Sequence, residues 1–188
     1  WWGGDEYAGD AATQADETKY EYNIFFLDCG RKYYSVDSIK QFIDNASAAG
    51  FNYIQLAVGN DGLRFLLNDM SLTVGDTTYS SDSVKNAIQD GNQKYNQTFD
   101  DQTKPPYYPY NPETNELTQS EMDTIIAYAN SKGMGVIPCV NTPGHMDAIL
   151  SAATSLTNID CSYNGSVRTI DVSNSTAVAF TQALLQKY

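Results

Sequence analysis

The sequence predicts an α/β protein built on a parallel β-sheet. Short apolar runs typical of buried strands alternate with segments whose apolar residues recur at helical spacing. The elements follow the order strand, helix, strand, insertion, helix, strand, helix. Repeated strand–helix units indicate parallel strands joined by right-handed crossovers. This order fits both an open sheet and a closed (β/α)8 barrel.

The first strand is expected at residues 22–28, which are apolar almost throughout and should therefore be buried on both faces. A helix follows, with Ser35 as its N-cap, an apolar residue at every third or fourth position, and Gly50 at its end. Residues 51–58 form the second expected strand.

An irregular insertion is expected at about residues 65–116, between the second strand and the next helix. Within it we predict a hairpin over residues 72–79, turning at Gly75 and Asp76, and a helix over residues 81–90. Long connections of this kind in a compact domain usually serve a function.

The last part of the chain continues the alternation. Thr118 and Glu121 predict a capping box at the start of a helix, and residues 135–140 predict the third strand. A helix is expected at residues 146–155, and a final one from Ser175 to the end. Between them, residues 167–171 are expected to be extended.

Composition narrows the function. The 188 residues carry a formal net charge of −12, which disfavours binding to nucleic acid or to an anionic membrane. No run approaches the length of a membrane span. Tyrosines (14) outnumber lysines and arginines together (11), which favours an extracellular surface and suits stacking on sugars. The three cysteines show no metal-binding spacing, and no metal or organic cofactor is expected.

Polar residues follow each of the three predicted strands. The carboxyl ends of parallel strands meet at one edge of a sheet, where α/β proteins place their chemistry. His145, the only histidine in the chain, has the alternative role of capping the helix that follows it. Together the set suits hydroxyl recognition and acid/base work. Its members are Asp28, Arg31, Asn60, Asp61, Asn141 and His145.

Four segments of this sequence, taken in order, resemble glycoside hydrolase family 20, the β-N-acetylhexosaminidases and lacto-N-biosidases. The segments are residues 27–35, 59–65, 117–121 and 137–145. The resemblance is greatest to large cell-surface enzymes of Gram-positive bacteria. It implies a (β/α)8 TIM barrel, of which residues 21–188 would supply only the first half.

The resemblance also implies a reaction. Family members hydrolyse terminal β-linked N-acetylhexosamine with retention, using the substrate's own 2-acetamido oxygen as nucleophile. Arg31 would then bind ring hydroxyls, with Asn60 and Asn141 as further substrate-binding residues. Asp61 and His145 would form a relay that tunes a catalytic Glu. Many members have Glu and Asp where this chain has Cys139 and Asn141.

The family's catalytic Asp–Glu pair ends its fourth barrel strand, yet the similar motif here lies in the segment 1–20, before the first strand. It comprises residues 3–11, with Asp5 and Glu6 as the candidate pair. Three interpretations stay open: a rearranged or permuted chain in which Glu6 is the acid/base and Asp5 orients the acetamido group, a fragment, or a chance match.

The implied partner is a glycan ending in N-acetylhexosamine, together with the remainder of the barrel. Two alternatives remain beside the hexosaminidase: a lacto-N-biosidase that releases a disaccharide, and a non-catalytic carbohydrate-binding module or inactive fragment. The expected location is extracellular, secreted or attached to a bacterial cell wall.

Overall fold

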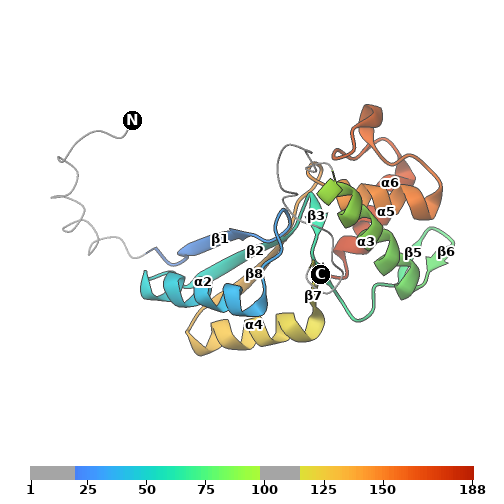
Figure 1. Cartoon of the computed structure of the whole chain (residues 1–188). Coiled ribbons are helices and arrows are strands. Elements are labelled where there is room, and N and C mark those ends of the chain that lie inside the picture. The colour runs from blue at the N-terminus through green and yellow to red at the C-terminus, as the bar shows by residue number, and fades with distance from the viewer. Residues whose placement is uncertain (1–19, 98–114) are drawn as a thin grey trace, which may run out of the picture.

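The computed structural model describes residues 20–97 and 115–188, and Figure 1 shows their arrangement. The central sheet contains β1 (Ile24–Asp28), β2 (Tyr53–Asn60) and β8 (Gly135–Val140). Both outer strands run parallel to β2, as predicted.

Two helices, α2 (Val36–Ala48) and α4 (Gln119–Ser131), cover one face of this sheet (Figure 1). Both begin as predicted. The Ser35 side chain accepts a hydrogen bond from the amide of Ser38, and Thr118 forms the complete capping box with Glu121. Leucine, isoleucine and valine side chains of β1 and β2 pack against these helices in one apolar core, which includes Leu27, Ile39, Ile43, Ile54, Leu56, Val58, Ile125 and Met134.

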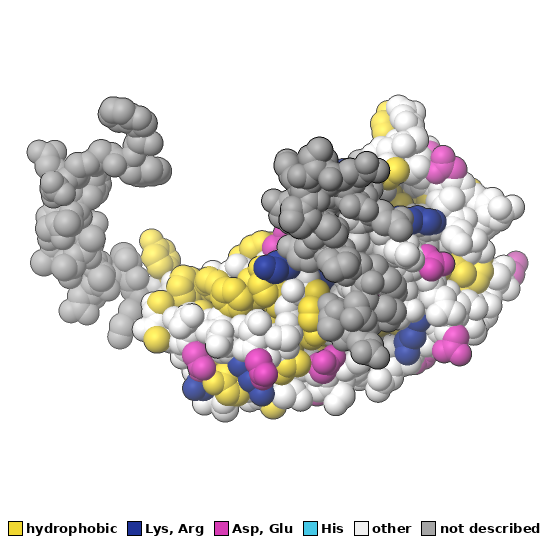
Figure 2. Space-filling model, viewed as in Figure 1, with side chains coloured by type: hydrophobic (Ala, Val, Ile, Leu, Met, Phe, Trp, Pro, Cys, Tyr) yellow, Lys and Arg dark blue, Asp and Glu magenta, His cyan; other side chains and the backbone are white. Residues whose placement is uncertain are grey.

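The opposite face of β1 corrects the expectation of a strand buried on both sides. Ile24 is 42% exposed and Phe26 is 53% exposed. Phe26 stands in register with Gln55 of β2, which in turn aligns with Ile137 of β8, so these side chains share that face. Figure 2 shows apolar side chains gathered over this end of the molecule. No described element covers this face, because the described helices of the sheet lie on its other side.

The insertion is more regular than predicted. After β3 (Gly62–Leu63), β4 (Phe65–Leu66) pairs with β7 (Leu117–Thr118). The predicted hairpin forms from β5 (Leu72–Val74) and β6 (Thr77–Tyr79).

The helix predicted within the insertion is present but longer than expected. It is α3 (Ser81–Gln97), seven residues beyond the predicted end at 90. Its buried Val84 and Ile88 face a second core that the pattern of short strands did not predict.

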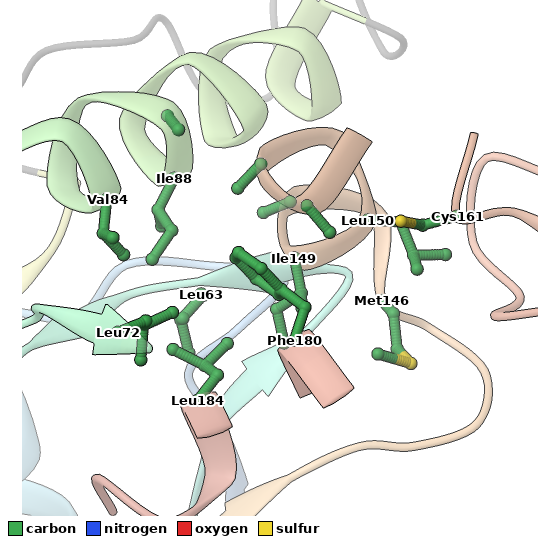
Figure 3. Packing of buried hydrophobic residues seen from close by; sticks show 14 of the residues in the cluster. Leu63, Leu72, Val84, Ile88, Met146, Ile149, Leu150, Cys161, Phe180 and Leu184 are labelled. Carbon is green, nitrogen blue, oxygen red and sulfur yellow. The ribbon is translucent and has the colours of Figure 1, made fainter. Parts of the chain in front are cut away.

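The second core joins α3 to α5 (Asp147–Thr157) and α6 (Ser175–Leu185). In Figure 3 the side chains of Val84, Ile88, Ile149, Leu150, Phe180 and Leu184 converge between these helices. The contact between α3 and α5 is close at Gly91, where a Cβ atom would lie 2.6 Å from the carbonyl oxygen of Ala148. A side chain at this position would force the helices apart.

The connection from α5 to α6 contains one 3-10 turn, η2 (Tyr163–Gly165). Residues 167–171 were expected to be extended. Within them, Ile170 forms an isolated antiparallel bridge with Ser162. The carboxyl ends of the strands lie between the two cores, so elements of both cores flank the polar side chains at this edge.

Candidate active site

The candidate site lies at the carboxyl ends of β1, β2 and β8, where the sequence predicted it. The loop after β1 approaches the end of β2 so closely that only glycine fits. A Cβ atom on Gly30 would lie 2.2 Å from the backbone nitrogen of Asn60. This contact brings Arg31, the next residue, up to the end of the neighbouring strand.

A chain of hydrogen bonds links the three strand ends. The Asn60 Nδ2 group donates to Asp28 Oδ2 over 2.8 Å, and Asn141 Nδ2 donates to Asn60 Oδ1 over 2.8 Å. Asp28 Oδ1 accepts from the backbone amides of Gly30 and Arg31. The side chains of Asn60 and Asn141 are thus fixed in orientation by each other and by Asp28.

Arg31, Asp61 and His145 form one cluster beside this chain. Arg31 Nε donates to Asp61 Oδ2 over 2.9 Å, and His145 Nδ1 lies 2.9 Å from Asp61 Oδ1. The Asp61 side chain is 3% exposed, whereas those of Arg31 and His145 are 48% and 45% exposed. The buried Asp61 carboxylate therefore orients two half-exposed groups toward solvent, the guanidinium of Arg31 and the imidazole ring of His145.

Backbone hydrogen bonds also hold this cluster in place. Asp61 and His145 both adopt left-handed conformations, with φ of 62° and 56°. This costs about 1 kcal/mol for each non-glycine residue. The amide of Asp61 donates to the carbonyl of His145 over 2.6 Å, and the amide of Ala148 donates to the carbonyl of Asp61 over 2.8 Å. These bonds offset the strain and lock the two residues together.

The protonation of the cluster follows from its donors. Burial alone would raise the pKa of Asp61, but hydrogen bonds from Arg31 and His145 outweigh it, so the pKa lies below its ordinary value. The ionised Asp61 is the acceptor in its contacts with both groups. Nδ1 of His145 also lies 3.2 Å from Arg31 Nη2, so one ring nitrogen faces both charged members of the cluster.

Three further residues, Tyr95, Asp147 and Arg168, belong to the surroundings of Asp61 and were not predicted from the sequence. The Tyr95 hydroxyl donates to Asp61 Oδ2 over 3.3 Å. Burial and the charge of Asp61 raise the pKa of the Asp147 carboxyl group to about 6. Arg168 lies 3.6 Å from Asp147. Asp147 lies two residues after His145, so its position in the sequence could have indicated that it belongs to the site. Tyr95 comes from the insertion helix, and no local pattern pointed to it.

Arg64 is the buried cation that supports the loop carrying Arg31. It is 1% exposed, and its Nε donates to the carbonyl of Gly30 over 2.6 Å. Its other nitrogens donate to the Asn115 and Asn96 side-chain oxygens. Arg64 lies in the segment 59–65 that resembles family 20, and this supporting role was not predicted for it.

Cys139 is half-buried, and its thiol lies 3.6 Å from Asn141 Oδ1. Asp5 and Glu6 lie outside the described residues. Within residues 20–97 and 115–188, no three His, Cys, Asp or Glu side chains are grouped to hold a metal ion. Nor does any helix in these ranges have the length and apolar character needed to cross a membrane.

Comparison with known families identifies the class of protein that this fold and site define. The model of the glycosyl hydrolase family 20 catalytic domain matches residues 20–187, so the chain belongs to this family. The match confirms the family resemblance in the sequence and implies a fold of the TIM-barrel type.

Among solved structures, the chain is similar to the pneumococcal virulence factor StrH, an exo-β-D-N-acetylglucosaminidase with tandem family 20 modules. Identity is 39% and the TM-score 0.78, over 89% of this chain and 38% of that one. The β-N-acetylhexosaminidase of Streptomyces coelicolor A3(2) shares the fold at 20% identity and a TM-score of 0.62, over 90% of this chain and 30% of that one. The chain thus spans well under half the length of these structures.

Proposed function

We propose that this protein is a retaining glycoside hydrolase that removes terminal β-linked N-acetylhexosamine from glycans by substrate-assisted catalysis. The observation that carries the proposal is the Arg31–Asp61–His145 cluster at the carboxyl edge of the sheet in a family 20 domain. The similarity to StrH, which is described as acting on N-glycans, supports this substrate class.

Arg31 is assigned to the hydroxyls of the terminal sugar. Its guanidinium is anchored through Nε by Asp61 but is 48% exposed, so it presents donors to a ligand without losing its position. Sugar hydroxyls accept from such a fork of N–H groups. Asn60 and Asn141, held rigid by their mutual hydrogen bond, are assigned as further substrate-binding groups.

Glu6 is assigned as general acid/base and Asp5 as the residue that orients the acetamido group. The acetamido oxygen attacks the anomeric carbon while Glu6 gives its proton to the leaving oxygen, and the glycosidic bond breaks to leave a bicyclic oxazolinium ion. Water then attacks the same carbon as Glu6 takes back a proton, which restores the acetamido group and retains the configuration. Asp61 and His145 would tune the pKa of Glu6 through the relay described above.

The described residues are assigned as the first part of the barrel, with the remainder of the barrel as partner. The exposed Ile24 and Phe26 support this, because inward-facing side chains of a TIM-barrel strand are covered only when the barrel closes. An extracellular location, secreted or on a cell wall, is supported by the acidic, tyrosine-rich composition.

The test is hydrolysis of p-nitrophenyl β-N-acetylglucosaminide by the purified protein, its Glu6→Gln variant and its Asp5→Asn variant. With the remainder of the barrel present, we expect turnover by the wild type and a loss of at least about a hundredfold in each variant, since each removes a group that acts in the transition state. Equal turnover in all three would refute the assignment of Asp5 and Glu6.

Absence of turnover together with retained sugar binding would favour the alternative of a non-catalytic carbohydrate-binding module. Faster release from a p-nitrophenyl lacto-N-bioside than from the monosaccharide would favour the lacto-N-biosidase instead.

A further inference from the structure

A groove of about 560 Å³ lies between α3 and α5, which pack side by side (Figure 1). Its volume falls within the range of about 300–1,000 Å³ that is usual for ligand sites. One wall is a single face of α5 and its C-cap, because the lining residues recur every three or four positions. These residues are Asp147, Leu150, Ser151, Thr154, Ser155 and Asn158.

The outer part of the groove presents polar groups that the fold does not use. Ser155 and Asn158 are exposed, and their side chains form no hydrogen bond with any residue that the structure describes. Lys94 Nζ donates to Ser151 Oγ over 3.2 Å, so the Ser151 hydroxyl keeps its own proton for another acceptor. Hydroxyl and amide groups both donate and accept, which suits a ligand that carries many hydroxyls.

The inner end of the groove contains a buried carboxyl group with spare acceptor capacity. Asp147 is 7% exposed and lines the groove where α5 begins. Its Oδ1 atom lies 3.6 Å from Arg168, but its buried Oδ2 atom has no donor among the residues that the structure describes. An acceptor left without a donor in a buried place is costly. A ligand in the groove that brings a donor to this carboxyl group would remove that cost.

Charge and shape indicate which ligand fits. Lys94 and Arg168 balance the carboxylates of Asp147 and Asp160 around the groove, so neither an anion nor a cation is favoured over a neutral ligand. Val167, which is 64% exposed, adds apolar surface that suits the C–H face of a sugar ring.

We propose that this groove is a second carbohydrate-binding site, which takes a neutral oligosaccharide of two or more units. It is separate from the Arg31 cluster but borders it, because Tyr95 lines the groove and donates to Asp61 over 3.3 Å. Internal units of a glycan held here raise the effective concentration of its terminal unit at the cluster. The choice of glycan rests on the proposed function, whereas the affinity of the groove for a neutral sugar is measured on its own.

A peptide is the competing occupant. Extended peptides usually add to the exposed edge of a sheet, and helical peptides insert an apolar face into an apolar groove. This groove lies between two helices and its outer wall is formed by hydroxyl and amide groups, so the lining favours a sugar.

The test is an NMR titration of the 15N-labelled protein with tri-N-acetylchitotriose. We expect the amide signals of Ser151, Ser155 and Asn158 to shift with one common dissociation constant. The same shifts should occur in Arg31→Met, because the groove does not include Arg31. A single sugar fills only part of the groove, so N-acetylglucosamine should bind there more weakly than the trisaccharide.

The double variant Ser155→Ala, Asn158→Gly removes two of the free polar groups. Alanine suits an exposed helix position, and glycine tolerates the left-handed conformation of Asn158, which has a φ of 56°. The fold should therefore be retained, which circular dichroism checks. We expect this variant to bind the trisaccharide at least about tenfold more weakly, since two hydrogen bonds are lost. Gln93→Ala is the matched control, because Gln93 is exposed on α3 but does not line the groove.

Equal affinity of the double variant and the wild type would overturn the proposal, as would the absence of shifts in the groove. Shifts caused by a neutral glycine–serine peptide of similar length, but not by the trisaccharide, would overturn it in favour of a peptide. Sugar binding in the groove without hydrolysis would refute only the proposed function. Hydrolysis without sugar binding in the groove would refute only the second site.

Discussion

Replacing Asp61 with Asn tests how much the buried carboxylate contributes to the site. The change keeps the shape but removes the charge that Arg31 and His145 contact at 2.9 Å each. Hydrogen bonds to a charged group contribute about 1.5–3 kcal/mol each. Both partners are about half exposed, so solvent screens the interaction and we take about 1 kcal/mol for each. The expected loss is about 2 kcal/mol in the free energy of unfolding.

For a protein of this size, about 2 kcal/mol corresponds to a melting temperature about 4–8 °C lower, measured by circular dichroism at pH 7. The matched control is Asp76→Asn in the exposed turn between β5 and β6, where Asn is well tolerated. Because the folded pKa of Asp61 lies below its ordinary value, the contribution exists above the unfolded pKa and is lost as the pH falls through the folded one. The difference from wild type should therefore shrink below about pH 4.

The same substitution should reduce hydrolysis of the p-nitrophenyl substrate by about a hundredfold, because His145 loses the charged partner that orients its ring. A melting temperature equal to that of the Asp76→Asn control, with unchanged turnover, would refute the reasoning about the cluster.

Further predictions concern the supports of the site. Arg64→Met leaves the carbonyl of Gly30 without its buried donor and should cost about 3 kcal/mol in urea denaturation; a cost below about 1 kcal/mol would contradict its supporting role. Gly30→Ala sets a Cβ atom 2.2 Å from the Asn60 nitrogen and should cost about 2 kcal/mol, with wild-type stability as the contrary result. Asn141→Asp replaces the donor to Asn60 Oδ1 with a carboxylate, so thermal melts should show a loss of about 1 kcal/mol at pH 7 that recovers near pH 4; a loss independent of pH would count against it.

The positions of the strands and helices followed from local pattern. The caps at Ser35 and Thr118 and the hairpin turn at Gly75 depend on neighbouring residues only, so the sequence was sufficient to predict them. The exposure of Ile24 and Phe26 was predicted wrongly, because an apolar run shows what a strand is suited to contact and not whether the described chain supplies it.

The candidate site also contains residues that the sequence was sufficient to predict and residues that it was not. Arg31, Asp61 and His145 were predicted to meet because parallel strands bring their carboxyl ends to one edge, and their contacts confirm this. Tyr95 reaches Asp61 only because α3 packs on α5. Such contacts depend on the packing of whole helices, which no local pattern specifies.

The most direct test of the central claim, that the cluster at the strand ends is the sugar site, is calorimetric titration of the protein with N-acetylglucosamine. The account predicts binding that Arg31→Met weakens at least about tenfold, since a charged donor to a hydroxyl contributes about 1.5 kcal/mol or more. Lys32→Met, which removes the neighbouring exposed cation, should bind as the wild type does. Equal affinity of Arg31→Met and wild type would contradict the account, as would the absence of binding to a folded wild-type protein.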